Sequence, residues 1–503
     1  MTTSTRCLVP ILLLVGAVGC TKDADSDTET GTDTGLVEDT GEPWRHECTT
    51  PAPLPVASTL LPGFTNAEDF AFDGEGYLVS IDEQGNLVGI DQEGHHKVIL
   101  PDAGQFTSGM HMLLDGSFVY SDAWAGTLMR AWPSGASAAV LSGMMYPNGI
   151  EVDRDGMVYV TEHDAGRVRR VDPETGESTV IATGIHNPNG VQFSTDYQTL
   201  YVGSFGGGMV HLVEREEAMS WSRPRLLGIV PTIDQEAIPD PCAGLTEGDE
   251  CIQRFGGLGE CTELGGGETD CPTVLDVDAC SGLTPGEVCT TDFLGTPVAS
   301  ACVLDSVVSA EPFCPRTASE RLGACKDASH WDGCMVRGES GYCVPSWEGV
   351  LICALDADYT LQEEACDEVP LGDPCTVPAP TGPYQGTCQD YTSWGYGIVC
   401  EPWYGWGDVG GLDGIGVDAC DNIYVTEYVT GVIYRFSPAG DVVEVVDETG
   451  AFWIPNMHWG NGIGGWDEEV LYVLDREAAV VHALEVGVLG SREAYQPEAR
   501  EER

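Results

Sequence analysis

The stretch Tyr146-Pro147-Asn148-Gly149-Ile150-Glu151-Val152-Asp153 decides the fold, because its pattern returns at nearly constant intervals on both sides. Aligning the Asp-Gly turns and Tyr-Val strands that follow it gives six equivalent positions, which are Glu68, Ser108, Asn148, Asn189, Asp413 and Asn461. Successive positions lie 40, 40, 41, 224 and 48 residues apart. Repeats of about 40 residues with about four short strands each are typical of propeller blades. The sequence therefore predicts an all-β fold, a six-bladed β-propeller.

The long interval between Asn189 and Asp413 contains a different kind of sequence. It holds 16 cysteines, which are Cys242, Cys251, Cys261, Cys271, Cys280, Cys289, Cys302, Cys314, Cys325, Cys334, Cys343, Cys353, Cys366, Cys375, Cys388 and Cys400. The even count and short spacing indicate a disulfide-rich, loop-rich module, and the Cys-x2-Cys spacing of zinc knuckles does not occur. We expect eight disulfides in four groups of four cysteines, and the pairing within each group stays open. We also expect Cys48 to pair with Cys420.

The N-terminus resembles a bacterial lipoprotein signal peptide. It has Arg6, an apolar run over residues 8–18 and a candidate lipidation site at Cys20, although Ala17 stands where leucine is more usual. The run is too short to span a bilayer. An ordinary cleaved signal, in which Cys20 has no role, is the alternative. Both interpretations predict an exported protein, and the first predicts a lipoprotein of the outer membrane or cell surface that meets the membrane only through its N-terminal lipid anchor.

The composition suggests the following domains: 1–19 signal peptide, 20–46 acidic disordered tether, 47–238 blades one to four, 239–402 cysteine-rich module, 403–490 blades five and six, and 491–503 polar C-terminal tail. A lone strand near residues 53–61 is expected to fill the outer place of the last blade and close the ring. The formal net charge of -59 argues against nucleic acid as a partner, because nucleic acid requires clusters of Lys and Arg.

The repeat positions of blades one, three, four and five carry hard oxygen ligands, and inner strands of a propeller converge on its central channel. Glu68, Asn148, Asn189 and Asp413 would thus form a ring suited to one divalent cation. Calcium is the ion that we expect first, with Mg, Mn and Zn as alternatives. Asn-Gly and Asp-Gly are also common turn dipeptides, so the same pattern could mark turns only.

About 270 residues, excluding the cysteine-rich module, resemble the senescence marker protein (regucalcin) and gluconolactonase family, with kinship to paraoxonases and strictosidine-synthase-like propellers. The resemblance rests on Ala-Glu-Asp at Glu68, Pro-Asn-Gly at Asn148 and Asn189, and Leu-Asp-Gly at Asp413. It implies one divalent metal in the channel and a lactone as substrate. The chain departs from paraoxonases at Ser108, where they place a catalytic histidine. It departs from regucalcin at Tyr146, where that protein has a sugar-binding arginine.

Metal-assisted hydrolysis of a lactone or small ester is the enzymatic hypothesis, with Asp413 or Asp69 taking a proton from water. Ser108, His111, Tyr146 and Asn461 are the candidates for the substrate pocket. The cysteine-rich module should lie beside or over the channel entrance on the side of the metal ring. The competing hypothesis is a non-catalytic binding propeller at the cell surface, whose cysteine-rich module binds a protein or glycan. The sequence leaves this choice open.

Overall fold

The computed structural model describes residues 48–493, apart from 65–66, 105, 218–219, 233–240, 254–256, 266–267, 272–274, 305–308, 310, 327, 381–382, 391, 393–396 and 403–409. The expectations for the signal peptide, Cys20 and the acidic tether lie outside the described residues. Across the described part of the chain, no helix is both long and apolar enough to cross a membrane.

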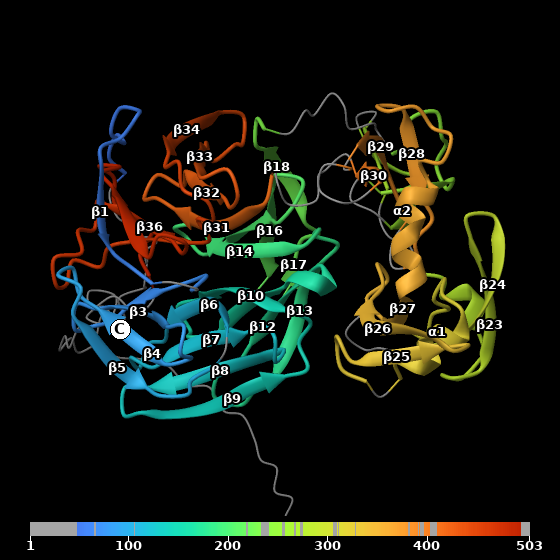
Figure 1. Ribbon diagram of the computed structural model, residues 1–503, viewed down its shortest axis with the longest axis horizontal. Coiled ribbons are helices and arrows are strands. Elements are labelled where there is room, and N and C mark those ends of the chain that lie inside the picture. The colour runs from blue at the N-terminus through green and yellow to red at the C-terminus, as the bar shows by residue number, and fades with distance from the viewer. Residues whose placement is uncertain are drawn as a thin grey trace, which may run out of the picture. The chain divides into compact units, whose positions relative to one another are not determined.

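Six antiparallel sheets form the blades, five with four strands and one, in blade four, with five, and Figure 1 shows them arranged around a centre. Blade one has β2 (Ala71–Phe72), β3 (Leu78–Ile81), β4 (Leu87–Ile90) and β5 (His96–Leu100), and blade two has β6 (Thr107–Met112), β7 (Phe118–Asp122), β8 (Thr127–Trp132) and β9 (Ala136–Ser142). Blade three has β10 (Pro147–Val152), β11 (Val158–Glu162), β12 (Arg167–Val171) and β13 (Ser178–Thr183). Blade four has β14 (Pro188–Phe193), β15 (Thr199–Ser204), β16 (Met209–Glu217) and β18 (Arg225–Ile229), and β17 (Ser220–Trp221) also pairs with β16. Blade five has β31 (Leu412–Val417), β32 (Ile423–Glu427), β33 (Val432–Phe436) and β34 (Val443–Glu448).

Blade six is completed by the start of the chain, as the sequence predicts. Its sheet order is β1 (Ser58–Pro62), β37 (Val480–Leu484), β36 (Leu471–Asp475) and β35 (Met457–Trp459). β1 runs antiparallel to β37, with Ser58 opposite Leu484 and Pro62 opposite Val480. The disulfide between Cys48 and Cys420 also forms, and it joins the N-terminal arm to the β31–β32 turn. The ring is therefore closed by a ladder and by a covalent bond.

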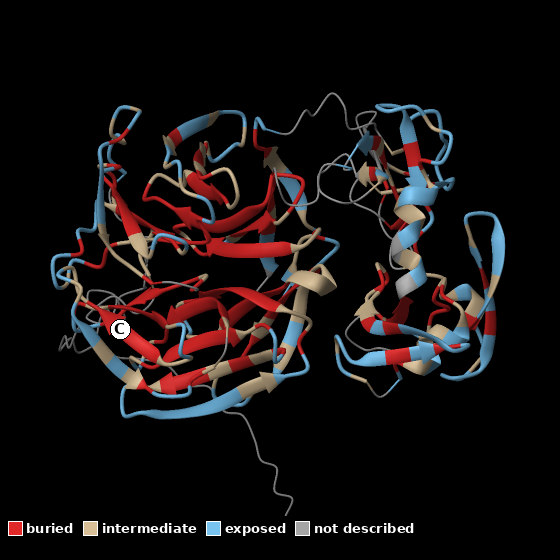
Figure 2. Ribbon diagram, in the orientation of Figure 1, coloured by how far each residue is buried: buried red, intermediate tan, exposed pale blue. Residues whose placement is uncertain are grey.

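Burial falls from the inner to the outer strand of each blade (Figure 2). Every residue of β10 is buried, whereas β9 at the rim of blade two is mostly exposed. The Asp-Gly turns between strands are held by their own side chains, as in blade three, where Asp153 Oδ1 accepts hydrogen bonds of 3.0 Å from the backbone N–H groups of Asp155 and Met157. Between these, Gly156 takes a φ of +80°, which glycine adopts without strain.

The cysteine-rich module consists of small hairpins and short helices. Its strands are β19 (Glu250–Ile252), β20 (Leu258–Glu260), β21 (Thr262–Gly265), β22 (Glu268–Asp270), β23 (Val288–Phe293), β24 (Thr296–Ala301), β25 (Gly333–Val336), β26 (Glu339–Pro345), β27 (Leu351–Leu355), β28 (Pro374–Val377), β29 (Tyr384–Asp390) and β30 (Ile398–Pro402). Its helices are α1 (Ser319–Ala324) and α2 (Leu361–Glu364), with 3-10 turns η3 (Asp278–Cys280) and η4 (Asp356–Thr360). Each group of cysteines forms its own small buried cluster.

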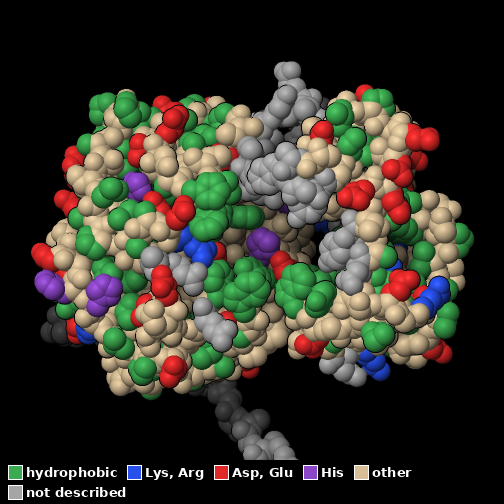
Figure 3. Space-filling view, viewed as in Figure 1, with side chains coloured by type: hydrophobic (Ala, Val, Ile, Leu, Met, Phe, Trp, Pro, Cys, Tyr) green, Lys and Arg blue, Asp and Glu red, His purple; other side chains and the backbone are tan. Residues whose placement is uncertain are grey.

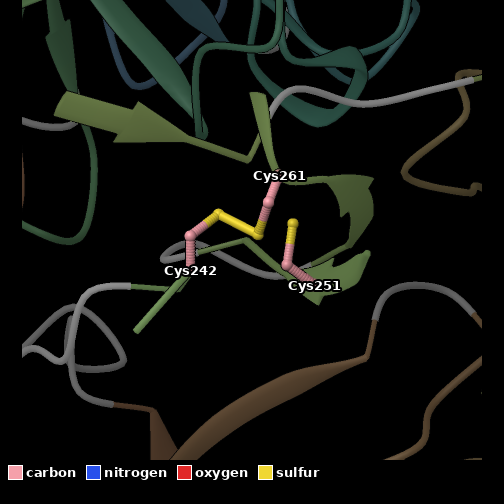
Figure 4. A group of neighbouring side chains, drawn as sticks. All are labelled: Cys242, Cys251 and Cys261. Carbon is pink, nitrogen blue, oxygen red and sulfur yellow. A yellow bond between two sulfur atoms is a disulfide. The ribbon is translucent and has the colours of Figure 1, made fainter. Parts of the chain in front are cut away.

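The eight disulfides expected in this module all form, and the pairing is the same in each group. The first cysteine of a group pairs with the third and the second with the fourth, as in Cys242–Cys261 and Cys251–Cys271. The other pairs are Cys280–Cys302, Cys289–Cys314, Cys325–Cys343, Cys334–Cys353, Cys366–Cys388 and Cys375–Cys400. Figure 4 shows Cys251 beside the Cys242–Cys261 bond. These sulfur atoms lie close enough to hold a metal, but metal binding needs thiolates and the sulfurs are in disulfides.

Candidate functional site

Four oxygen-bearing side chains from four blades line one cavity of about 470 Å³. Asn148 lies in β10, Asn189 in β14 and Asp413 in β31, while Glu68 lies just before β2. These are the four residues for which the sequence predicts a metal ring. Tyr146, one of the predicted pocket residues, lines the same cavity.

Three of these donors, Asn148, Asn189 and Asp413, are followed by a glycine whose role the sequence pattern alone does not reveal. Gly149 and Gly190 lie inside the inner strands β10 and β14, so they are not turn residues. A Cβ on Gly149 would lie 2.4 Å from the backbone oxygen of Asn189, and a Cβ on Gly190 would lie 2.3 Å from that of Asp413. Inner strands of neighbouring blades therefore approach too closely for any other residue. This close approach is what brings the donor side chains of successive blades together.

The four donors suit a cation, because two of them are largely buried carboxyl groups and a third has a buried oxygen without a hydrogen-bond partner among the described residues. Asn148 Oδ1 is buried and has no hydrogen-bond partner among the described residues. Burial raises the pKa of Glu68 to about 7, even though the neighbouring Arg476 opposes the shift. Burial and the nearby Glu68 raise the pKa of Asp413 well above its usual range. A divalent ion would balance the charge of the two carboxylates and would take the two amide oxygens as ligands. The residues of the ring therefore fit a divalent ion.

Arg476 is a neighbour of the ring that the sequence analysis missed. It follows β36 in blade six, forms an ion pair with Glu68, and donates from Nη1 to the Tyr428 hydroxyl at 3.1 Å. Tyr428 follows β32 in the same way, directly after the acidic residue that ends the second strand of its blade. His163 and Phe205 also come directly after second strands and line the cavity. The residue after the second strand is thus a second repeat position, and the acids Glu162, Glu427 and Asp475 mark it in the sequence.

A second polar group on the cavity wall consists of His163 and Asp164, in the 3-10 turn η1 (His163–Ala165). His163 Nδ1 lies 2.7 Å from Asp164 Oδ1. His330 of the cysteine-rich module places its Nε2 atom 3.1 Å from Asp164 Oδ2. Although burial alone would raise it, these two imidazoles lower the pKa of Asp164 to about 2. Asp164 is therefore an anion that orients His163.

His186 differs from His163, although both line the cavity. Burial, helped by the nearby His163 and His211, lowers the pKa of His186 to about 3. Its imidazole is consequently neutral and a weak base at neutral pH.

Asp69 lies beside the ring but is held by other groups. Its Oδ1 accepts from the Phe70 N–H at 2.8 Å and lies 3.0 Å from His458 Nε2, and its Oδ2 accepts from the Met110 N–H at 2.6 Å. It is buried and does not line the cavity. Asp69 therefore links the start of blade one to blades two and six. Because both of its carboxylate oxygens have hydrogen-bond partners, it is poorly placed to act as the base that the sequence suggested.

The residues that line the cavity do not include three further pocket candidates, Ser108, Asn461 and His111. Ser108 Oγ donates to the Pro147 carbonyl at 2.8 Å, so it ties blade two to blade three. Asn461 Nδ2 donates to the Asp73 carbonyl at 2.9 Å, so it supports a turn of blade one. The equivalent of Asn189 and Asp413 in blade six is instead Asn456, because a Cβ on Gly414 would meet Asn456 Cα at 2.6 Å. The Pro455-Asn456 dipeptide repeats the Pro-Asn of blades three and four. This repeated dipeptide could have identified Asn456 as the equivalent position in blade six.

His111 lies further along β6, within a buried cluster of charges. Its Nε2 is 3.0 Å from Glu493 Oε2 and 3.5 Å from Glu151 Oε1. Burial alone would lower the pKa of His111, but the hydrogen bond that His111 donates to Glu493, together with the negative charges of Glu493 and Glu151, raises it to about 9. The Tyr197 hydroxyl donates to the Arg492 carbonyl at 2.7 Å, and the Ser491 N–H donates to Val417. Residues 491–493, which the sequence assigned to a polar tail, are therefore bound to the propeller.

Aromatic rings from several blades contact one another in series, and five of them, Trp124, Tyr146, His163, Phe205 and Tyr428, line the cavity. Phe106 lies 5.8 Å from Trp124 between ring centroids, and Trp124 lies 5.9 Å from Tyr146. Tyr146 in turn lies 5.5 Å from the His163 ring. Figure 3 shows hydrophobic side chains gathered around a hollow, with a histidine side chain inside it.

The ring contacts continue on the other side of the cavity. The His163 ring lies 6.0 Å from Phe205, Phe205 lies 5.6 Å from Tyr428, and Tyr428 is stacked on Trp453 at 6.4 Å. The guanidinium of Arg476 lies 5.9 Å from the Trp453 ring and 5.6 Å from that of Phe106, which closes the circuit. We call these seven rings, Phe106, Trp124, Tyr146, His163, Phe205, Tyr428 and Trp453, the aromatic girdle.

The cysteine-rich module also reaches the cavity. Trp331, which follows His330 in the third group of cysteines, is one of the residues that line it. The Trp331 ring lies 4.9 Å from the His330 ring. The expectation that the module meets the channel on the side of the donor ring agrees with these contacts.

Comparison with known proteins gives similar structures and little sequence similarity. Gluconolactonases are among the similar structures. One, described as a putative gluconolactonase, shares 12% identity over 87% of this chain and 94% of its own, with a TM-score of 0.40. A gluconolactonase from Xanthomonas campestris shares 20% identity over 46% of this chain and 88% of its own, with a TM-score of 0.32. A luciferin-regenerating enzyme shares 11% identity over 87% of this chain and 99% of its own, with a TM-score of 0.44.

No family model matches the chain, and no curated protein matches it. The neighbours agree with the resemblance that the sequence suggested. At such low scores and identities they carry no argument about function. The propeller is established by the chain's own six sheets.

Proposed function

We propose that this protein binds one divalent cation in its central channel, calcium before Mg, Mn or Zn, and hydrolyses a lactone or small ester there. The observation that carries the proposal is the convergence of Glu68, Asn148, Asn189 and Asp413 on one cavity, with Asn148 Oδ1 buried and without a hydrogen-bond partner in the part of the chain that the structure describes. A bound divalent ion would polarise the carbonyl oxygen of the substrate as a Lewis acid. The remaining chemistry falls to the side chains around it.

His163 is the side chain best placed to act as general base. Its Nδ1 faces the Asp164 carboxylate at 2.7 Å, so that Nε2 is the ring nitrogen free to accept a proton. Water would attack the acyl carbon and give its proton to Nε2, and the ester C–O bond would break. The same proton would then pass to the departing alkoxide oxygen. This assignment leaves Asp413 as a ligand and replaces Asp69 as the base.

The test combines calcium-binding calorimetry with a lactone and ester hydrolysis screen on the oxidised chain from residue 47. Asp413→Ala should abolish calcium binding and hydrolysis together. His163→Gln should keep calcium binding and lower kcat by about 100-fold or more, the usual contribution of a general base. The control is Asp91→Asn, which removes one ligand from an exposed group of Asp91, Glu93 and His95 and should leave calcium binding unchanged.

Each outcome separates the two functional hypotheses. Calcium binding that persists in Asp413→Ala would refute the channel site. Calcium binding that is lost in Asp413→Ala, without hydrolysis of any ester by the unmodified protein, would favour the binding propeller. Unchanged kcat in His163→Gln would remove His163 from the mechanism.

We also propose that the protein is exported and attached to the outer membrane or cell surface through lipid on Cys20. The proposal rests on the signal-like sequence at residues 1–19 and on compartment chemistry. The described residues contain nine disulfides. Disulfides persist in oxidising compartments and are rare in the cytosol. Mass spectrometry of the mature N-terminus tests the proposal, since an N-terminus other than lipid-bearing Cys20 would refute it.

A further inference from the structure

We propose that the third group of cysteines, which opens at Cys325, forms part of the active site, and that its His330 is a positioning residue for His163. This inference rests on the proposed function, in which His163 takes a proton from water. It deepens that function, because it gives the cysteine-rich module a part in the reaction.

Each group of cysteines has the same turn before its second cysteine, and in three groups a glycine stands three places before that cysteine. The glycines have left-handed φ angles, +86° at Gly248, +93° at Gly286 and +84° at Gly372. Each donates its backbone N–H to the carbonyl of the third cysteine of its group, at 2.8, 2.8 and 2.9 Å respectively. A Cβ at any of the three would meet open space, so the φ angle alone explains the glycine.

The third group departs from this pattern at the same position. Trp331 donates its backbone N–H to the Cys343 carbonyl at 2.8 Å, as the glycines do, and has a φ of +66°. A bulky residue with this φ costs free energy, and such costs cluster at functional sites. The place of the Trp331 ring agrees with that, because it lines the channel cavity together with five rings of the aromatic girdle. The turn therefore carries a strained tryptophan where the ring reaches the channel.

His330 precedes Trp331 and is also directed at the propeller. Its side chain is only 9% exposed, and its Nε2 lies 3.1 Å from Asp164 Oδ2. The same turn position in the fourth group holds Leu371, which is exposed. The strand β26 of the third group contacts η1, the turn that carries His163 and Asp164. Two neighbouring contacts thus seat the third group on this part of blade three.

The Asp164 carboxylate lies between two imidazoles. Its Oδ1 is 2.7 Å from His163 Nδ1, and its Oδ2 is 3.1 Å from His330 Nε2. If the carboxylate rotates, it gives up one of these contacts, so His330 holds Oδ1 in place against His163. The partner of one ring nitrogen sets the tautomer of a histidine, and a fixed Asp164 keeps the proton of neutral His163 on Nδ1. His330 is not among the residues that line the cavity, and it acts on the reaction through Asp164.

Nitrogen-15 NMR of the full oxidised chain, labelled at histidine, tests this arrangement without a substrate. The His163→Gln variant identifies the His163 signals, and the spectra are recorded at a pH where this ring is neutral. We expect the proton of His163 to be on Nδ1 in the unmodified protein. His330→Ala should give a mixture of the two tautomers. His330→Gln should restore the Nδ1 tautomer, because its amide N–H can donate to Asp164 in place of the imidazole.

Trp331→Gly is a second variant, and it retains the turn because the other three groups have glycine there. It removes the ring that lies 4.9 Å from the His330 ring, and it should also yield a mixture of tautomers. Leu371→Ala is the matched control, since it truncates the same turn position in the fourth group. It should leave His163 as it is in the unmodified protein.

Kinetics with any ester that the hydrolysis screen identifies give a second measurement. His330→Ala should lower kcat at least about tenfold, because a misplaced catalytic group loses rate. Its KM should stay nearly unchanged, since His330 does not touch the substrate.

A proton on Nε2 of His163 in the unmodified protein, a pure Nδ1 tautomer in His330→Ala, or an unchanged kcat in that variant would each overturn the role of His330. A failure of the proposed function is recognised separately, because it appears in the unmodified protein as absence of calcium binding or of ester hydrolysis, whatever the tautomer of His163.

Discussion

Arg476 and a channel cation should compete for Glu68, and removing the arginine should therefore strengthen cation binding. Arg476 pairs with Glu68, and both side chains are largely buried, at 12% and 13% exposure. With Glu68 and Asp413 ionised, a divalent ion makes the ring neutral, and Arg476 adds one positive charge to it. Arg476→Met removes that charge and keeps an apolar side chain between Phe106 and Trp453.

The magnitude follows from Coulomb's law. Repulsion between a divalent ion and a guanidinium roughly 6 Å away amounts to roughly 5 kcal/mol at an effective dielectric constant of about 20. Arg476 can turn toward solvent when the ion binds, which recovers much of this energy. We therefore expect calcium affinity to rise at least about tenfold, equivalent to about 1.4 kcal/mol.

Calorimetric titration with calcium measures the change at fixed ionic strength. Arg225→Met is the control, since Arg225 pairs with Glu214 on the exposed surface of blade four and tests the general effect of losing one positive charge. Its affinity should change much less, because salt screens distant surface charges. Unchanged or weaker calcium binding in Arg476→Met would refute the competition and show that Arg476 supports the ring.

Two further predictions concern stability. Because burial raises the pKa of Glu68 from 4.5 to about 7, its contribution to the stability of the calcium-free protein is fully present below about pH 4.5. This contribution is lost as the pH rises through about 7, by up to about 3 kcal/mol. Thermal unfolding in a calcium chelator should show that loss, saturating calcium should reduce it, and a Tm without pH dependence in this range would contradict the assignment. Replacing Cys48 and Cys420 together by serine should lower the free energy of unfolding of the propeller by about 2–4 kcal/mol in denaturant titrations. Replacing Cys251 and Cys271 should leave the propeller transition in place, and equal effects of the two double variants would argue against closure of the ring by Cys48.

The blades could be predicted because local sequence determines them. Each repeat has its own turn residues and strands, and the closing strand follows from the three strands that blade six offers. The disulfide pairing could not be predicted, because four cysteines allow three pairings and the choice depends on how each hairpin folds. In every group the first cysteine pairs with the third and the second with the fourth. This shared pairing could be recognised only once the strands of the module, such as β25–β27 and β28–β30, were known.

The donor ring could be predicted because one repeat position carries it. Asn461 was misplaced because blade six has an irregular loop before β36, and counting from Asp-Gly turns shifted the register by five residues from Asn456. Arg476 and His163 were missed because they follow the second strands of their blades, which is a different repeat position from the one that carries the donors. The role of Glu493 depends on a contact across 382 residues with His111, which no local pattern encodes.

The Cys48–Cys420 bond also determines how the protein would respond to a mechanical load. Residues 1–47 precede Cys48, so a pull applied through them reaches the β31–β32 turn of blade five through a covalent bond. Without that bond the same pull would act on β1 and peel it from β37 one residue pair at a time, which is the weakest direction in which to load a sheet. With the bond in place, β1 lies outside the force path, and the propeller can be held by its N-terminal segment without being opened at its seam.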